Sequence, residues 1–128
     1  MIVDASALIA IVVREPAALE LAEKIRCTDV KGIGTPTLVE TGIILRAKIG
    51  EEARMVLFDL VTRFDLHPIP FGELHWREAF AASLRFGKGR HAAALNFGDC
   101  MTYATAKLSG HPLLCTGDDF RQTDLVLA

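Results

Sequence analysis

Cysteine is scarce in this chain of 128 residues, and its three cysteines are far apart. Cys27, Cys100 and Cys115 each lie within or beside an apolar segment, and no CxxC pair or HExxH motif is present. An odd number of scattered cysteines argues against a disulfide framework and favours buried, reduced thiols in a cytosolic protein. Because 51% of the residues are hydrophobic, the chain can form a core without disulfides or structural zinc.

A long hydrophobic run is also missing. The apolar run over residues 5–13 is far shorter than the roughly 20 residues that cross a bilayer. Asp4 interrupts its start, and no basic segment precedes it, so it is a poor signal peptide. The sequence therefore predicts a cytoplasmic protein with no membrane partner.

Several catalytic and cofactor motifs are absent as well. Without GxSxG, the nucleophile elbow of the Ser-His-Asp hydrolases is not indicated, and without GxxxxGK[ST] or GxGxxG no nucleotide cofactor is indicated. The net charge of −2 at first argues against a nucleic-acid partner. If a bound cation neutralises four acids, the net charge becomes +2. The total charge therefore neither supports nor excludes a nucleic-acid partner.

Helical and short apolar segments alternate along the whole chain. Helices are expected over residues 7–13, 16–26, 35–50, 51–64, 73–86 and 99–108, with strands at 1–3, 31–34, 66–69, 113–115 and 125–127. Pro16 and Thr35-Pro36 are suited to helix starts, and Gly110 to a helix end. This alternation predicts one α/β domain with a small parallel sheet between helices.

Four acidic positions stand at the edges of apolar segments. They are Asp4 in MIVDAS, Glu40 in TPTLVETGI, Asp99 in NFGDCMTYA and the pair Asp118/Asp119 in LLCTGDDF. An unpaired carboxylate against an apolar core costs several kcal/mol or changes its pKa. Asp4 and the pair follow predicted strands, and ligands of such sheets bind at the carboxyl ends of the strands. A shared divalent cation would relieve all these costs, and carboxylates match Mg²⁺ or Mn²⁺.

A metal held in this way orients and activates a water and neutralises charge on a phosphate, which suggests phosphodiester hydrolysis. Ser6 and Thr116 are positioned to hydrogen-bond a carboxylate or a metal-bound water. Each acid also has a simpler interpretation: Asp4 as a helix cap, Glu40 as an exposed helical acid, Asp99 as a partner of the helix dipole, and Asp118/Asp119 as turn residues.

The segment FGKGRH, residues 86–91, is the clearest predicted loop. Lys88, Arg90 and His91 either contact phosphates or are simply solvated. Trp76 and Tyr103 are expected to be core or interface aromatics rather than base-stacking platforms.

Three segments together resemble a known family. MIVDASALIAIVVREP, TPTLVETGIIL and FGKGRHAAALNFGDCMTYATAKLSGHPLLCTGDDFRQTDL, taken in this order, are similar to the PIN-domain ribonucleases, specifically the VapC toxins of bacterial type II toxin–antitoxin systems. The resemblance implies a single three-layer α/β/α PIN domain over residues 1–128. It also implies that the catalytic and metal-binding acids are Asp4, Glu40, Asp99 and Asp119, with Asp118 as an open alternative, and that Ser6 and Thr116 are active-site hydroxyls.

The resemblance further implies a Mg²⁺- or Mn²⁺-dependent endoribonuclease that leaves 5′-phosphate and 3′-hydroxyl ends. It implies a homodimer, neutralisation by a VapB-type antitoxin, and a tRNA or ribosomal RNA target. Two other functions stay open: an acidic pocket that binds a basic peptide without catalysis, and a DNA nuclease that uses the same metal site.

Overall fold

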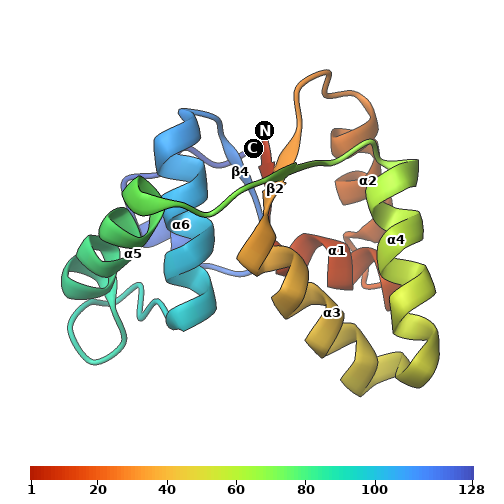
Figure 1. Ribbon diagram of the computed structural model, residues 1–128, viewed down its shortest axis with the longest axis horizontal. Helices are drawn as coiled ribbons and strands as arrows, with labels where there is room; N and C mark the ends of the chain where they lie inside the picture. Colours follow the sequence, from red (N-terminus) through yellow and green to blue (C-terminus); the bar gives the residue numbers. More distant parts are fainter.

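A four-stranded parallel sheet forms the centre of the computed structural model, which describes residues 1–128. The strands are β1 (Ile2–Val3), β2 (Gly32–Gly34), β3 (His67–Ile69) and β4 (Leu113–Leu114), in the order β3-β2-β1-β4. In the central strand, Ile2 is in register with Gly32 on one side and Leu113 on the other. All pairs are parallel, so the carboxyl ends of the strands lie at one edge, the lower one in Figure 1.

Helices cover both faces of this sheet (Figure 1). One side carries α1 (Ala5–Val12), α2 (Ala18–Arg26), α3 (Thr35–Ile49) and α4 (Ala53–Arg63), and the other carries α5 (Glu73–Phe86) and α6 (Phe97–Ser109). A separate hydrophobic cluster lies on each side, centred on residues such as Leu8 and Ile25 in one case and Phe86 and Tyr103 in the other. The three-layer α/β/α prediction is therefore confirmed. No helix is long and apolar enough to cross a bilayer.

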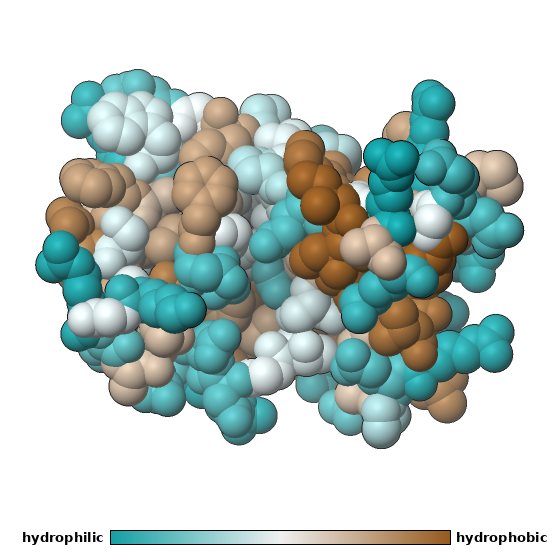
Figure 2. All heavy atoms as spheres, turned by 90° about the horizontal axis from the view of Figure 1, so that it is seen from below, coloured by the Kyte–Doolittle hydropathy of each residue, from teal (hydrophilic) through white to brown (hydrophobic).

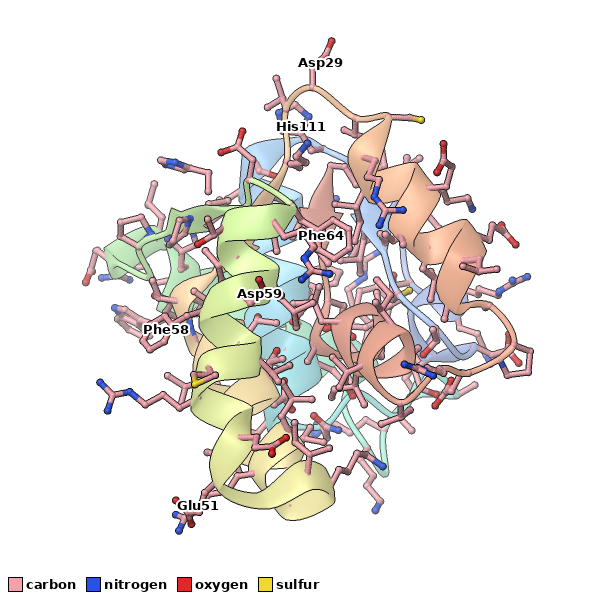
Figure 3. The ribbon with its side chains drawn as sticks, turned by 90° about the vertical axis from the view of Figure 1, so that its right-hand side faces the viewer. Asp29, Glu51, Phe58, Asp59, Phe64 and His111 are labelled. Carbon is pink, nitrogen blue, oxygen red and sulfur yellow. The ribbon has the colours of Figure 1, made fainter.

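The long α3 and the outer α4 form a hairpin through the short 3-10 helix η1 (Gly50–Glu52). Figure 3 views α4 from outside, with Phe58 on the left of the helix and Phe64 on the right of its upper end. Phe64 is 3% exposed and Phe58 is 61% exposed, so one face of α4 is in the core and the other meets solvent. The predicted helix 51–64 is shorter in the structure, because its first two residues belong to η1 and α4 begins at Ala53. Gly50, with a positive φ of 73°, ends α3 before it.

Other helix starts differ from the predictions by one or two residues. The second helix begins at Ala18 rather than Pro16, because a turn closed by the Ala18 N–H and the Glu15 carbonyl precedes it. Gly34, not Thr35, caps α3, so Pro36 is inside its first turn. The last segment, 125–127, is not a regular strand, since it makes a single bridge between Leu113 and Leu127.

Capping side chains set the starts of the first and last helices. Asp4 caps α1, which therefore starts at Ala5 rather than Ala7. Asn96 caps α6, so this helix starts at Phe97 and places Asp99 in its first turn. Gly110 ends α6 with a φ of 68°, as predicted. Of the cysteines, all free, Cys100 is buried but Cys27 is exposed, so the expectation of buried thiols is wrong for Cys27, which lies at the solvent-facing end of α2.

The carboxyl-terminal segment is held to α5 and α6 by Asp124. Its carboxylate accepts hydrogen bonds from the Tyr103 hydroxyl (2.7 Å), Arg85 (3.0 Å) and Lys107 (2.9 Å). These donors, the tyrosine first, hold the pKa of Asp124 well below its ordinary value of 3.8. The segment thus has an ionic anchor on the second hydrophobic cluster.

We expect Asp124→Asn to lower the free energy of unfolding by about 1–3 kcal/mol, since charge-assisted hydrogen bonds are lost. Because the folded pKa is depressed, the stabilisation is present above the ordinary pKa of 3.8 and is lost as the pH falls below it. Urea unfolding at pH 7 measures the loss. Asp59→Asn, which breaks an exposed ion pair with Arg63 on α4, is the control and should cost under about 1 kcal/mol. Equal losses in the two variants would contradict the anchor.

Candidate active site

Three of the predicted acids line one cavity at the carboxyl edge of the sheet. Asp4 follows β1 directly, Glu40 comes from the second turn of α3, and Asp99 comes from the first turn of α6. The cavity has a volume of about 280 Å³. Figure 2 views the protein from this edge, where hydrophilic side chains occupy the middle of the face between more apolar regions. Residues from both halves of the chain therefore meet where such sheets bind ligands.

Asp4 is the most buried of these acids, with 6% of its surface exposed. One carboxylate oxygen, Oδ2, accepts hydrogen bonds from the Ser6 backbone N–H (3.0 Å) and the Ser6 hydroxyl (2.6 Å). The other, Oδ1, accepts a hydrogen bond from the Thr102 hydroxyl (2.9 Å). The helix-cap interpretation of Asp4 is thus correct, but capping uses only Oδ2, and Oδ1 faces a different partner.

Thr102 connects Asp4 to a buried polar network that the sequence analysis did not identify. Its hydroxyl lies 3.0 Å from that of Thr37 on α3, and both residues are almost fully buried. Since Thr102 donates to Asp4, Thr37 donates to Thr102. The sequence could have indicated Thr102, because a residue three positions after Asp99 in a helix lies on the same helix face as Asp99.

Glu40 is half-buried, and its side chain forms no hydrogen bond or ion pair within the protein. Burial raises its pKa above the ordinary 4.5, and the negative charges of Asp4 and Asp99 raise it further. The interpretation of Glu40 as an ordinary exposed helical acid is therefore wrong: α3 turns this side chain toward the other acids.

Asp99 forms a capping box with Asn96. Its carboxylate accepts from the Asn96 N–H (2.9 Å), and the Asn96 side chain accepts from the Asp99 N–H (2.9 Å). Burial nevertheless raises the pKa of Asp99 above the ordinary 3.8, with Asp4 and Asp119 adding to the effect. Asp99 is thus both a capping residue and a member of the acidic group.

The pair Asp118/Asp119 is exposed and does not line the cavity. Asp118 forms an ion pair with Arg121, 3.2 Å away, and its side chain is 84% exposed. The charge of Asp119, by contrast, raises the pKa values of Asp99 and of the neighbouring Cys115. Asp119 is therefore the member of the pair that is electrostatically coupled to the acidic group.

Ser6 and Thr116 join the ends of the two strands beside the cavity. The Ser6 hydroxyl donates to Asp4 and accepts a hydrogen bond from the Thr116 backbone N–H (3.0 Å). Both residues line the cavity with the acids. Ser6 thus links the end of β1 to the loop that follows β4.

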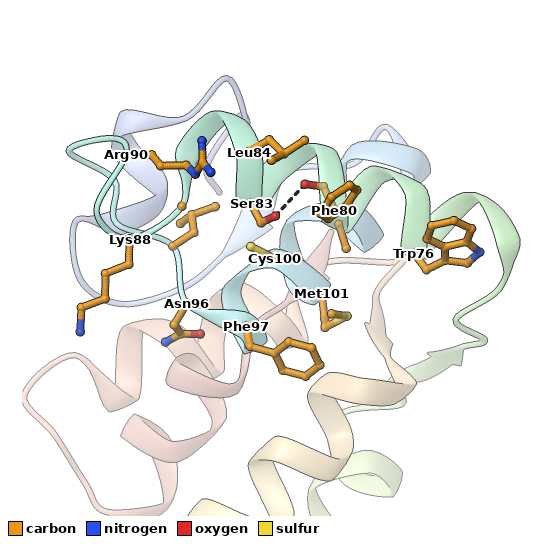
Figure 4. A pocket seen from close by; sticks show the side chains of 13 residues that line it. Trp76, Phe80, Ser83, Leu84, Lys88, Arg90, Asn96, Phe97, Cys100 and Met101 are labelled. Carbon is orange, nitrogen blue, oxygen red and sulfur yellow. Dashed lines mark hydrogen bonds between the residues drawn. The ribbon is translucent and has the colours of Figure 1, made fainter.

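Lys88 and Arg90 lie elsewhere, along a larger groove of about 640 Å³ between α5 and α6 (Figure 4). Trp76, Phe80 and Leu84 project along α5, and Phe97 and Met101 face them from α6. Trp76 is 49% exposed, as an interface residue would be, whereas Tyr103 is a core residue with 1% exposed. The two basic side chains are exposed and border this groove, not the acidic cavity.

Two further residues at the cavity were missed. Glu15 lines it from the turn after α1, where Arg14 adopts a left-handed φ of 57°. Gly98 lies under the Glu40 carboxylate, where a side chain would collide with it. As the side chains stand, no group of three His, Cys, Asp or Glu residues is close enough together to hold a metal ion.

These features define an α/β protein with a carboxylate-lined cavity at the carboxyl edge of a parallel sheet. Residues 1–125 match the PIN domain. The chain belongs to the PIN-domain family, and within it to the VapC group of relatives described next.

Curated relatives match almost the whole chain. The Mycobacterium tuberculosis protein named ribonuclease VapC36 is 46% identical over 126 residues, which cover 98% of this chain and 91% of that protein. The ribonuclease VapC of Mycolicibacterium smegmatis is 38% identical over 125 residues, covering 98% of this chain and 97% of that protein. The resemblance stated from the sequence motifs is therefore confirmed.

Solved structures share the fold at low sequence identity. VapC20 of M. tuberculosis, described as a toxin that cleaves the sarcin–ricin loop, has a TM-score of 0.80 at 15% identity, covering 99% of this chain and 97% of that one. VapBC2 of Rickettsia felis, bound to a DNA fragment from its promoter, has a TM-score of 0.76 at 14% identity, with coverage of 99% and 96%. At these identities the likeness supports the fold.

Proposed function

We propose that residues 1–128 act as one PIN domain, a metal-dependent endoribonuclease toxin of a VapBC type II toxin–antitoxin system. The observation that carries the proposal is the convergence of Asp4, Glu40 and Asp99 on one cavity, where burial and mutual repulsion raise the pKa values of Glu40 and Asp99. Relatives named VapC ribonucleases at 38–46% identity support the reaction class. Such repulsion is what a bound cation relieves.

The donor set fits Mg²⁺ or Mn²⁺, which prefer oxygen ligands. Glu40 has both carboxylate oxygens free, and Asp99 has one oxygen free beside the one that caps α6. Asp4 keeps an unused lone pair on Oδ1. We infer that these three residues hold the metal, with Asp119, whose charge acts on Asp99, as the fourth rather than Asp118, which pairs with Arg121. Because the acids as they stand are too far apart to hold a metal together, their side chains would have to move closer on binding.

When bound, the metal supplies an activated water and charge neutralisation at the scissile phosphate. Ser6 and Thr102 hold the Asp4 carboxylate in one orientation through three hydrogen bonds. Thr116 also lines the cavity, and its hydroxyl would orient a water there. Lys88 and Arg90 contact the RNA backbone away from the reacting phosphate.

The antitoxin is the partner that we propose for the apolar groove. Trp76, Phe80, Leu84 and Phe97 are each about half exposed or more, and such a cluster marks an interaction surface. A second apolar cavity, lined by Val39, Ile43 and Met101 among others, includes Glu40 and so continues the surface to the acids. An antitoxin arginine that follows this path would pair with Asp4, Glu40 or Asp99 and displace the metal. We further propose that the toxin is a homodimer.

Removal of the metal tests the proposed function directly. We expect cleavage of single-stranded RNA with Mg²⁺ or Mn²⁺, 5′-phosphate ends on the products, and no cleavage in EDTA. Calorimetry with Mn²⁺ should show binding. Absence of both cleavage and Mn²⁺ binding would favour a peptide-binding pocket, and preferred cleavage of DNA of the same sequence would favour a DNA nuclease. Either result would contradict the proposal.

A further inference from the structure

Gly98 lies beneath the Glu40 carboxylate. A Cβ atom built on Gly98 would meet three atoms of that side chain, with Glu40 Cδ 2.6 Å away and Oε2 2.8 Å away. Real Cβ atoms essentially never approach another atom so closely. The carboxyl group of Glu40 therefore occupies the space that any side chain at position 98 would need.

The backbone gives no other reason for a glycine here. Gly98 is the second residue of α6, and it is absent from the glycines with positive φ, namely Gly50, Gly89, Gly110 and Gly117. In an ordinary helical conformation glycine is less favourable than alanine. The chain thus has a less favourable helical residue at the position where the Glu40 carboxylate comes closest to the space of a Cβ atom on α6.

Glu40 depends on this space because nothing else holds it. Its side chain makes no hydrogen bond or ion pair, in contrast to those of Asp4 and Asp99, so its position follows from packing. Glu40 and Gly98 also line the apolar cavity of about 500 Å³ beside the acids. A side chain at position 98 would drive the carboxylate out of the acidic cavity, toward that apolar cavity or solvent.

We propose that Gly98 is a positioning residue, whose missing side chain lets Glu40 reach the acidic cavity beside Asp99. The proposal deepens the proposed function, on which its consequence for metal binding rests. It adds that the adjacent residues Gly98 and Asp99 act together: Gly98 makes room for an acid of α3, and Asp99 supplies an acid of α6.

Alanine at position 98 provides the test, with Gly72→Ala as its matched control. Gly72 also stands at a helix start, has no positive φ, and a Cβ there would meet no atom within 4 Å. We expect both variants to melt within about 4 °C of the wild type. Only Gly98→Ala should lose RNA cleavage and Mn²⁺ affinity, by about 10- to 100-fold, the usual cost of disturbing the support of a metal ligand.

A double-mutant cycle with Glu40→Ala separates positioning from a general structural effect. If Gly98 acts through Glu40, Gly98→Ala should cause no further loss of Mn²⁺ affinity or cleavage in the Glu40→Ala background. A full additional loss there, or wild-type affinity and cleavage in Gly98→Ala alone, would overturn the proposal. The double variant also removes the collision, so it folds even where Gly98→Ala does not.

A crystal structure of metal-free Gly98→Ala tests the positioning without any activity. We expect the Glu40 carboxylate to leave the acidic cavity while Asp4 and Asp99 keep their hydrogen bonds. An unmoved Glu40 would overturn the proposal even if the wild type cleaves RNA. A displaced Glu40 in Gly98→Ala, together with a wild type that neither cleaves RNA nor binds Mn²⁺, would support the positioning and contradict the proposed function.

Discussion

Asp4→Asn is expected to abolish RNA cleavage while leaving the fold intact. Asp4 is the most buried of the three acids that line the cavity and the one most firmly held. An amide is a poor ligand for a hard cation compared with a carboxylate, and it removes one negative charge from the site. We expect cleavage to fall by more than about 100-fold. Mutation of a residue that only supports a metal ligand already lowers metal affinity or activity by about 10- to 100-fold.

The fold survives this change because asparagine can satisfy the same three partners. Its carbonyl oxygen accepts from the Ser6 N–H and hydroxyl, as Oδ2 of Asp4 does. Its amide then donates to the Thr102 hydroxyl, which is free to turn and donate to Thr37. Asparagine is also as good a helix cap as aspartate, so α1 keeps its start.

The measurement compares initial rates of RNA cleavage and urea unfolding curves for the variant and the wild type. Asp29→Asn is the control: this acid is exposed in a turn at the opposite end of the protein, as Figure 3 shows at the top of the view. The control should keep full activity. A folded Asp4→Asn protein that cleaves RNA at the wild-type rate would refute the metal mechanism.

Sequence patterns predicted the sheet and most helices because local signals agree with the tertiary structure. Apolar runs such as Met1–Val3 are long enough only for strands, and the alternation with helices implies parallel pairing. The helix Glu73–Phe86 has the predicted bounds. Boundaries failed where a single interaction decides them, as with the Asn96–Asp99 capping box.

The acids were easier to identify than the residues that position them. Asp4 and Asp99 stand beside recognisable segment ends, and a carboxylate against an apolar run is conspicuous. Thr102 and Gly98 look ordinary in a helix, and their roles depend on how α3 crosses α6. Helix crossing is set by the packing of distant segments, which no local pattern encodes.

The acids that the proposed function needs lower the stability of the metal-free protein at neutral pH. Burial raises the pKa of Glu40 above 4.5, and Asp4 and Asp99 raise it further. The folded state therefore binds the Glu40 proton more tightly than the unfolded state does. The contribution of Glu40 to stability is most favourable below the ordinary pKa of 4.5, falls as the pH rises from there to the raised pKa, and stays lower at neutral pH.

Glu40→Gln should remove this penalty and also the activity. We expect the variant, without metal, to be more stable than the wild type at pH 7 and to lose less stability between pH 4.5 and pH 7. Some decline remains, because the pKa of Asp99 is raised in the same direction. Asp124 has the opposite effect, but only below its ordinary pKa of 3.8 and so outside this range. Cleavage should fall by more than about 100-fold, as for Asp4→Asn.

Urea unfolding in EDTA across this pH range measures both quantities, with Glu20→Gln as the control. Glu20 is an exposed acid on α2, paired only with Lys24, so its variant should keep the wild-type pH dependence. Adding Mn²⁺ should then stabilise the wild type more than Glu40→Gln, since the metal binds the folded state and needs the carboxylate. A Glu40→Gln protein that is less stable than the wild type at pH 7, or that gains as much from Mn²⁺, would show that Glu40 is a structural residue.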